Sequence, residues 1–178
     1  MSHNISRIRK VSRLFRVFFT IWLVCTPLLY ISYWVFFNDL PEPIKNTGLP
    51  GIITQVLSVK DRCWGFLASL MPMSITIAAF WILVRLFALY EQGAIFTADN
   101  VKCFRRLGYI LLLWSFLGVI YAKFILSLFP FLSPHEHVTL ALQSHEVITM
   151  FLIGGVLVLI SWVMDEGREL EDEQSLTI

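Results

Sequence analysis

The chain contains four long runs that carry no charged residue, at residues 17–37, 63–84, 107–122 and 147–164. An α-helix rises about 1.5 Å per residue and the hydrocarbon core of a bilayer is about 30 Å thick, so about 20 apolar residues are needed to cross it. Such segments can extend into polar sequence at their ends. We therefore predict four transmembrane helices, at about 14–37, 63–88, 107–131 and 146–164.

The composition supports a membrane location. Hydrophobic residues make up 57% of the chain and charged residues only 15%, and the mean hydropathy is +0.71. A soluble domain averages about 45–50% apolar and about 25% charged residues. One small core cannot cover this apolar excess, so much of it must face lipid. We predict a single all-α domain over residues 1–178, a bundle of four transmembrane helices.

The distribution of Lys and Arg predicts the orientation of the helices, because cytoplasmic segments carry an excess of both. Residues 1–16 contain five such cations and residues 85–106 contain four. The segment 38–62 balances three against three acids, and 132–145 has none. We expect both termini and the turn at 89–106 in the cytoplasm, with outer loops at 38–62 and 132–145.

The sequence EQGAIFTADN, at 91–100, has the features of a short capped turn between two helices. Gly93 suits the left-handed position after a helix end. Thr97 suits an N-cap, and Phe96 with Val101 has the spacing of a hydrophobic staple. So short a turn requires the flanking spans to pack antiparallel against each other. An alternative role is docking of a cytoplasmic partner, with candidate residues Phe96, Thr97, Asn100, Arg105 and Arg106.

The segments LYEQGAIFTADNVKCFRRLG and SWVMDEGRELEDEQSLTI resemble the bacterial membrane family called domain of unknown function 2975. The family pattern is a Gly-x-x-Phe-Thr-x-x-Asn turn and an acidic tail that ends in Leu-Thr-Ile or Leu-Thr-Val. The residues that match are Gly93, Phe96, Thr97, Asn100, Arg105, Gly108, Gly167, Leu170, Leu176, Thr177 and Ile178. The resemblance implies a bacterial inner-membrane protein with no assigned catalytic residue. It also implies a cytoplasmic helix-turn-helix regulator as a partner.

Each predicted span contains a Pro or Gly about 15–20 Å from its cytoplasmic charges, near the middle of the membrane. The residues are Pro27, Pro72, Gly118, Gly154 and Gly155. Proline bends a helix and glycine allows close helix approach, so this level could form a hinge or a small cavity. Both residues are also common in membrane helices without such a role.

Two short charge patterns recur along the chain. An acid–Gly motif follows the second run at 91–93 and the fourth run at 165–167, and an Arg-Leu pair precedes the first and third runs. Two similar helical hairpins are a possible explanation.

His135, His137 and His145 lie near two glutamates in the predicted outer loop. Histidine and carboxylate groups could bind zinc or copper. On one continuous helix, however, the first two diverge by about 200° and the last two are about 12 Å apart along the axis. We favour no metal site and no cofactor, and an acid-sensing role of the histidines remains an alternative.

The predicted cytoplasmic tail at 165–178 holds six acids and a single cation, Arg168. Acids at a helix C-terminus oppose the helix macrodipole, so a cation elsewhere should compensate them. The cation could belong to the N-terminal arm, to Arg105 and Arg106, or to a basic cytoplasmic protein. Candidate docking residues in the tail are Glu169, Glu171, Asp172 and Glu173.

No Ser/His/Asp set, phosphate-binding loop or pair of intramembrane carboxylates is present in the sequence, so we expect no enzymatic activity. The favoured hypothesis is a membrane sensor or tether that holds a cytoplasmic DNA-binding regulator without contacting nucleic acid itself. Alternatives are a small helical-bundle transporter or export accessory, and a structural or assembly subunit of a membrane complex. Homo-oligomer formation is compatible with each.

Overall fold

The computed structural model describes residues 2–45, 56–94, 97–128 and 136–175, and every element in them is helical. The elements are α1 (Ser2–Val35), the 3-10 helix η1 (Phe37–Asp39), α2 (Glu42–Lys45), α3 (Val59–Gln92), α4 (Ala98–Leu128) and α5 (Glu136–Ser175). The helices α1, α3, α4 and α5 are long and apolar enough to cross a membrane. The predicted all-α fold with four such helices is confirmed.

The long helices exceed the apolar runs that predicted them. With 40 residues α5 is about 60 Å long, twice the hydrocarbon thickness. It begins at Glu136, well before the predicted span, and continues through most of the acidic tail. Helix α1 is the exception at one end: it stops at Val35, two residues before the predicted end of the span at residue 37, because the chain continues as the 3-10 helix η1. Once a helix is nucleated, adding one more hydrogen-bonded residue costs little, so polar sequence extends it on either side.

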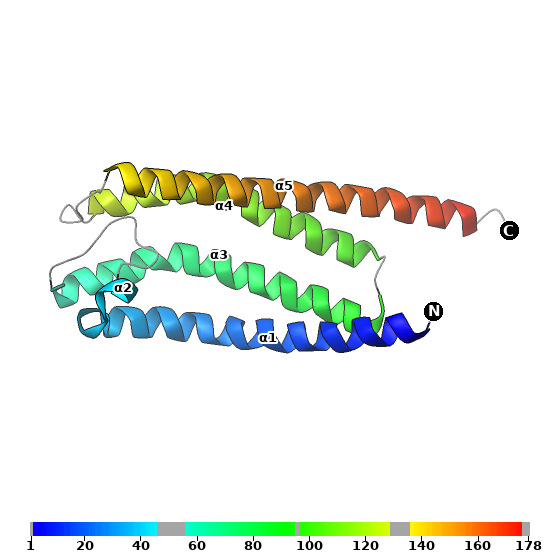
Figure 1. Ribbon diagram of the computed structural model, residues 1–178, viewed down its shortest axis with the longest axis horizontal. Coiled ribbons are helices and arrows are strands. Elements are labelled where there is room, and N and C mark those ends of the chain that lie inside the picture. The colour runs from blue at the N-terminus through cyan, green and yellow to red at the C-terminus, as the bar shows by residue number, and fades with distance from the viewer. Residues whose placement is uncertain (1, 46–55, 95–96, 129–135, 176–178) are drawn as a thin grey trace.

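The four long helices form two hairpins. Helix α1 packs along α3, and α4 packs along α5, whereas α3 and α4 contact each other much less. Figure 1 shows the two pairs as separate layers. Two hairpins were suggested by the repeated charge patterns. The connection at 93–97 therefore joins two antiparallel helices whose main packing partners are other helices.

Both described termini lie at the same end of the molecule. The start of α1, the end of α3, the start of α4 and the end of α5 lie together, and the opposite four helix ends form the other end (Figure 1). We call the first the charged end, because most of the Lys and Arg residues are in its segments.

A small aromatic core closes the end opposite the charged end. Trp34, Phe37, Leu57 and Ile125 form its buried cluster and come from α1, η1, the segment before α3, and α4. Asn38 fixes this segment: its amide donates to the Leu57 carbonyl and its side-chain oxygen accepts from the Leu57 N–H, both at 3.0 Å. This core is the place where the two hairpins share buried side chains.

Trp34 also joins α1 to α3. Its indole N–H donates to the Ser69 hydroxyl at 3.0 Å, and its ring covers Gly65 so closely that a Cβ there would lie 2.1 Å from the ring. Helix α3 begins nearby with a capping box, in which Ser58 and Asp61 each accept from the other's backbone N–H. These contacts fix the start of α3 against the end of α1.

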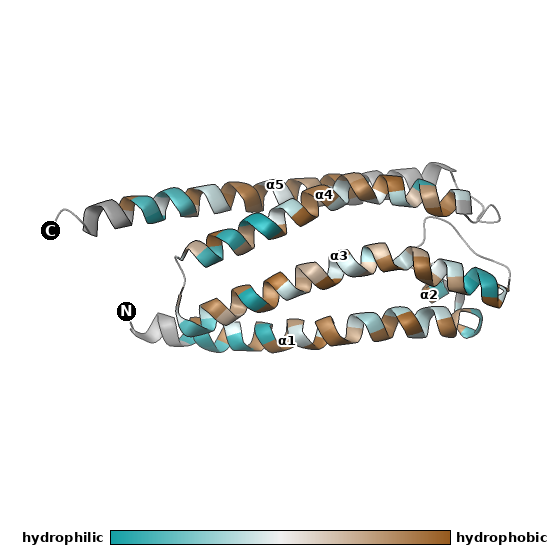
Figure 2. Ribbon diagram, turned by 180° about the vertical axis from the view of Figure 1, so that it is seen from behind, coloured by the Kyte–Doolittle hydropathy of each residue, from teal (hydrophilic) through white to brown (hydrophobic). Residues whose placement is uncertain are grey.

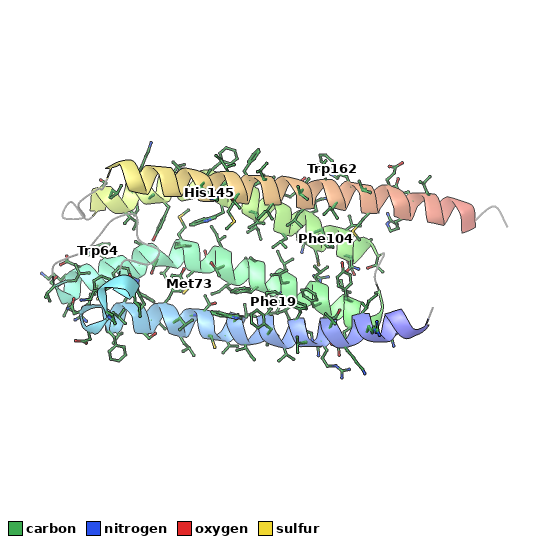
Figure 3. The ribbon with its side chains drawn as sticks, in the orientation of Figure 1. Phe19, Trp64, Met73, Phe104, His145 and Trp162 are labelled. Carbon is green, nitrogen blue, oxygen red and sulfur yellow. The ribbon has the colours of Figure 1, made fainter. Side chains whose placement is uncertain are left out.

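Toward the charged end, aromatic rings fill the space between α1 and α3. The ring centroid of Phe19, which is labelled in Figure 3, lies 5.6 Å from that of Phe87 and 6.0 Å from that of Phe80. Phe15 stacks on Phe87 at 5.1 Å. Stacked aromatic rings stabilise helix packing by more than the burial of their surface area alone would.

Most of the apolar surface remains uncovered by the chain itself. In the most apolar 18-residue stretch of each long helix, the chain buries only 6% of the residues in α1 and α3 and 17% in α4 and α5. Figure 2 shows hydrophobic residues around the circumference of the long helices. Since a soluble monomer rarely exposes large apolar patches, these faces are suited to contact with lipid.

Candidate functional site at the charged end

The α3–α4 turn has the predicted glycine geometry. Gly93 has φ 86°, and it is the positive-φ residue of the described chain. Its N–H donates to the Tyr90 carbonyl at 3.0 Å, and the Ala94 N–H donates to the Leu89 carbonyl at 3.1 Å. This pair of bonds is a Schellman motif, which satisfies carbonyl groups at the helix end. The prediction for Gly93 is confirmed.

Thr97 occupies the predicted N-cap position directly before α4, but its side chain makes no capping bond. The Thr97 carbonyl accepts from the N–H groups of Asn100 and Val101, but its hydroxyl is buried without a hydrogen-bond partner among the described residues. The side chain of Asn100, which is fully buried, donates to the Ala94 carbonyl at 2.5 Å. Asn100 therefore holds the turn from inside and offers no surface for docking. Phe96 lies outside the described residues, so its staple and docking roles stay predictions.

The basic N-terminal arm binds the end of α3. Arg13 donates to the Glu91 carboxylate at 2.7 Å, and Arg16 lies 3.1 Å from the other oxygen of that carboxylate. The Arg9 guanidinium lies beside Gly93, 3.0 Å from where a Cβ would be. The arm is thus held by α3 through Glu91, an ion-pairing residue of the charged end that is not among the candidates predicted from the sequence.

Arg105 provides the compensating cation for the first acid of the tail. Its guanidinium donates to Asp165 at 2.7 Å, and Arg168 lies 3.5 Å from the second oxygen of the same carboxylate. This is the intramolecular alternative that the sequence left open for Arg105. The neighbouring Arg106 is exposed and has no ion pair within the described part of the chain.

Beyond Asp165, α5 extends past the ends of the other long helices (Figure 1). Glu166, Glu169 and Leu170 are exposed, and a Cβ at Gly167 would meet nothing within 4 Å. The helix continues through residues 171–173, whose side chains lie outside what the structure describes, so the roles of Glu171, Asp172 and Glu173 stay predictions. The last part of α5 is therefore an acidic helix free of packing at Gly167.

The glycines and prolines predicted as hinge or cavity residues have different surroundings. Pro27 and Pro72 lie inside α1 and α3, which remain helical around them. Gly154 is buried against Leu112 of α4, whereas Gly155 has no neighbour within 4 Å of its Cβ position. The atoms nearest to a Cβ at Gly118 belong to Trp114 of its own helix. Gly154 is thus a helix contact, and hinge motion at this level stays a prediction.

Of the three histidines of the metal-site hypothesis, the structure describes the side chain of His145 alone. His145 is exposed on α5, His135 is not described, and His137 is on α5 with an undescribed side chain. Within the described residues, no group of three or more His, Cys, Asp or Glu side chains could hold a metal ion.

These features define an all-helical membrane protein whose two hairpins meet at a turn framed by ion pairs. The chain belongs to the family described as Protein of unknown function (DUF2975), which it matches over residues 35–178. The resemblance seen in the sequence is therefore confirmed. No curated protein and no solved structure matches the chain.

Proposed function

We propose that this protein is a tether in the bacterial inner membrane that holds a basic cytoplasmic regulator through the acidic end of α5. The regulator would be a small helix-turn-helix DNA-binding protein, as the family resemblance implies. Both termini of the tether are cytoplasmic in this proposal. The excess of Lys and Arg in the segments at the charged end supports that orientation.

The observation that carries the proposal is the exposed, acidic extension of α5. Its first acid, Asp165, is paired with Arg105, but Glu166 and Glu169 have no ion pair among the described residues. In the N-terminal arm, Arg13 and Arg16 bind Glu91 and not these acids. An acidic helix of this kind attracts a basic partner over about a Debye length. Leu170, which is 52% exposed, adds an apolar contact on the same segment.

Capture by the solubilised protein tests the tether. Four substitutions neutralise the tail: Glu169→Gln, Glu171→Gln, Asp172→Asn and Glu173→Gln. They should weaken capture of the regulator about ten- to a hundredfold, since each exposed ion pair with the regulator adds only a small part of the binding free energy. Capture should also decrease steeply with ionic strength. A control variant with Asp39→Asn and Glu42→Gln, at the opposite end, should capture like the wild type.

Two outcomes would count against the tether. Failure to retain any cytoplasmic protein at low salt, with or without the tail, would contradict it and favour the transport alternative. Unchanged or stronger capture after tail neutralisation would show that the tail masks a docking surface elsewhere on the protein.

A further inference from the structure

One exposed face of α4 changes in character along its length. Lys102, Arg106, Tyr109, Leu113 and Phe116 follow one another at spacings of three or four residues, so they share one face of the helix. All five are exposed. From the charged end inward, the face presents two cations, then a tyrosine, then apolar side chains. This order matches a phospholipid, from its phosphate through the interface to its acyl chains.

Helix α3 presents the same order at the same depth. Trp81 and Arg85 are four residues apart and both exposed. At 1.5 Å per residue, Arg85 lies about 10 Å from the end of α3, and Arg106 about 12 Å from the start of α4. Trp81 and Tyr109 both lie about 16 Å from those ends. The two arginines therefore occupy one level, with an aromatic residue a turn deeper on each helix.

The cations of the two helices converge near one carboxylate. Asp99 lies 4.0 Å from Arg85 and 3.6 Å from Lys102. Arg106 lies four residues beyond Lys102, one turn along the same exposed face of α4. Arg85 and Lys102 thus share one acid, Asp99, and Arg106 has no ion pair within the described part of the chain.

We propose that Arg85, Lys102 and Arg106 bind the phosphate of an anionic phospholipid whose acyl chains lie along the exposed face of α4. The surplus positive charge attracts an anionic headgroup more than a zwitterionic one. Arginine donates two parallel hydrogen bonds to phosphate, which gives the site geometric specificity beyond charge attraction. Tyr109 and Trp81 lie at the depth of the lipid glycerol groups, where interfacial aromatic residues are common. This site is independent of the tether proposal, because it uses none of the acidic residues of α5.

Native mass spectrometry of the full chain in detergent measures the bound lipid. With phosphatidylglycerol as the probe, the wild type should retain lipid saturably, and phosphatidylcholine should be retained at least tenfold more weakly. A triple variant, Arg85→Gln, Lys102→Gln and Arg106→Gln, should bind phosphatidylglycerol about a hundredfold more weakly, since each surface cation contributes about fivefold. The matched control, Arg7→Gln, Lys10→Gln and Lys60→Gln, removes three exposed cations outside the site and should stay within about twofold.

A second variant separates lipid binding from a structural effect. Asp99→Asn removes the acid that competes with the phosphate, so it should tighten phosphatidylglycerol binding about fivefold. Glycerol phosphate in solution should not displace the lipid at equal concentration, because it lacks acyl chains. Equal losses in the triple variant and its control, equal retention of phosphatidylcholine, weaker binding by Asp99→Asn, or displacement by glycerol phosphate would each overturn the lipid site.

Discussion

Gly108 on α4 and Gly154 on α5 are in backbone contact. A Cβ at Gly108 would lie 2.8 Å from the Gly154 carbonyl oxygen, and a Cβ at Gly154 would lie 2.9 Å from the Gly108 carbonyl oxygen. Helices in a membrane gain little from hydrophobic association, so small residues that permit close packing are a main source of their affinity. This reciprocal contact explains how α4 and α5 pack along each other although both are apolar on every side.

Gly108→Ala should therefore destabilise the α4–α5 hairpin. The added methyl group would also lie 2.7 Å from a Val158 methyl, so the helices must separate. Overpacking of this kind costs about 1–3 kcal/mol, which should lower the Tm measured in detergent. Gly155→Ala is the matched control, because nothing lies within 4 Å of its Cβ position. The Tm of this control should remain constant or increase slightly, as alanine favours helix. Equal Tm values for the two variants would contradict the contact.

Gly65→Ala should loosen α1 from α3 at the end opposite the charged end. Its methyl group would overlap the Trp34 ring, which cannot move away without losing its hydrogen bond to Ser69. We expect a lower Tm and a red-shifted tryptophan emission as Trp34 becomes more exposed. Gly118→Ala, whose Cβ would be 3.6 Å or more from its nearest neighbour, should change neither measurement. An unaltered Tm in Gly65→Ala would show that α1 and α3 are not packed here as described.

Arg105→Gln should release the charged end of α5 from α4, because Asp165 would then retain only the longer contact to Arg168. Hydrogen exchange should become faster at the charged end of α5 and stay unchanged at the start of α3. The reversed pair, Arg105→Glu with Asp165→Arg, should restore slow exchange. Arg106→Gln serves as the control, since Arg106 is exposed and has no ion pair in the described residues. Failure of the reversed pair to restore protection would argue against a direct interaction.

Cysteine labelling tests the proposed orientation. Cys63 is exposed in the first turns of α3 and should react with an impermeant maleimide from outside intact spheroplasts. Cys103 is buried, so its failure to react would not report on sidedness. Gln92→Cys, at an exposed position at the other end of α3, is the better inside reporter and should react only after permeabilisation. Labelling of Gln92→Cys in intact spheroplasts would invert the topology.

The turn between α3 and α4 shows where sequence reasoning succeeded and where it stopped. Gly93 was predictable, because the left-handed conformation at a helix end strongly favours glycine whatever surrounds it. The role of Thr97 was not, since its hydroxyl could have bonded the first turn of α4, and instead the Asn100 side chain holds the Ala94 carbonyl. Whether a polar side chain at a turn bonds a backbone N–H or a carbonyl depends on how the turn packs, and that packing is a tertiary property.

The sequence by itself determined that four helices are long and apolar enough to cross a membrane, because the bilayer thickness fixes the number of apolar residues required. It also determined the family, through motifs at the turn and the tail. Only the tertiary structure decided that α1 packs on α3 and α4 on α5, that Glu91 binds the N-terminal arm, and that Arg105 binds Asp165. The physical reason is that the most apolar part of each long helix stays largely uncovered by the chain, so hydrophobicity does not select a partner. Shape at Gly108 and Gly154, and the positions of a few charges, make that selection.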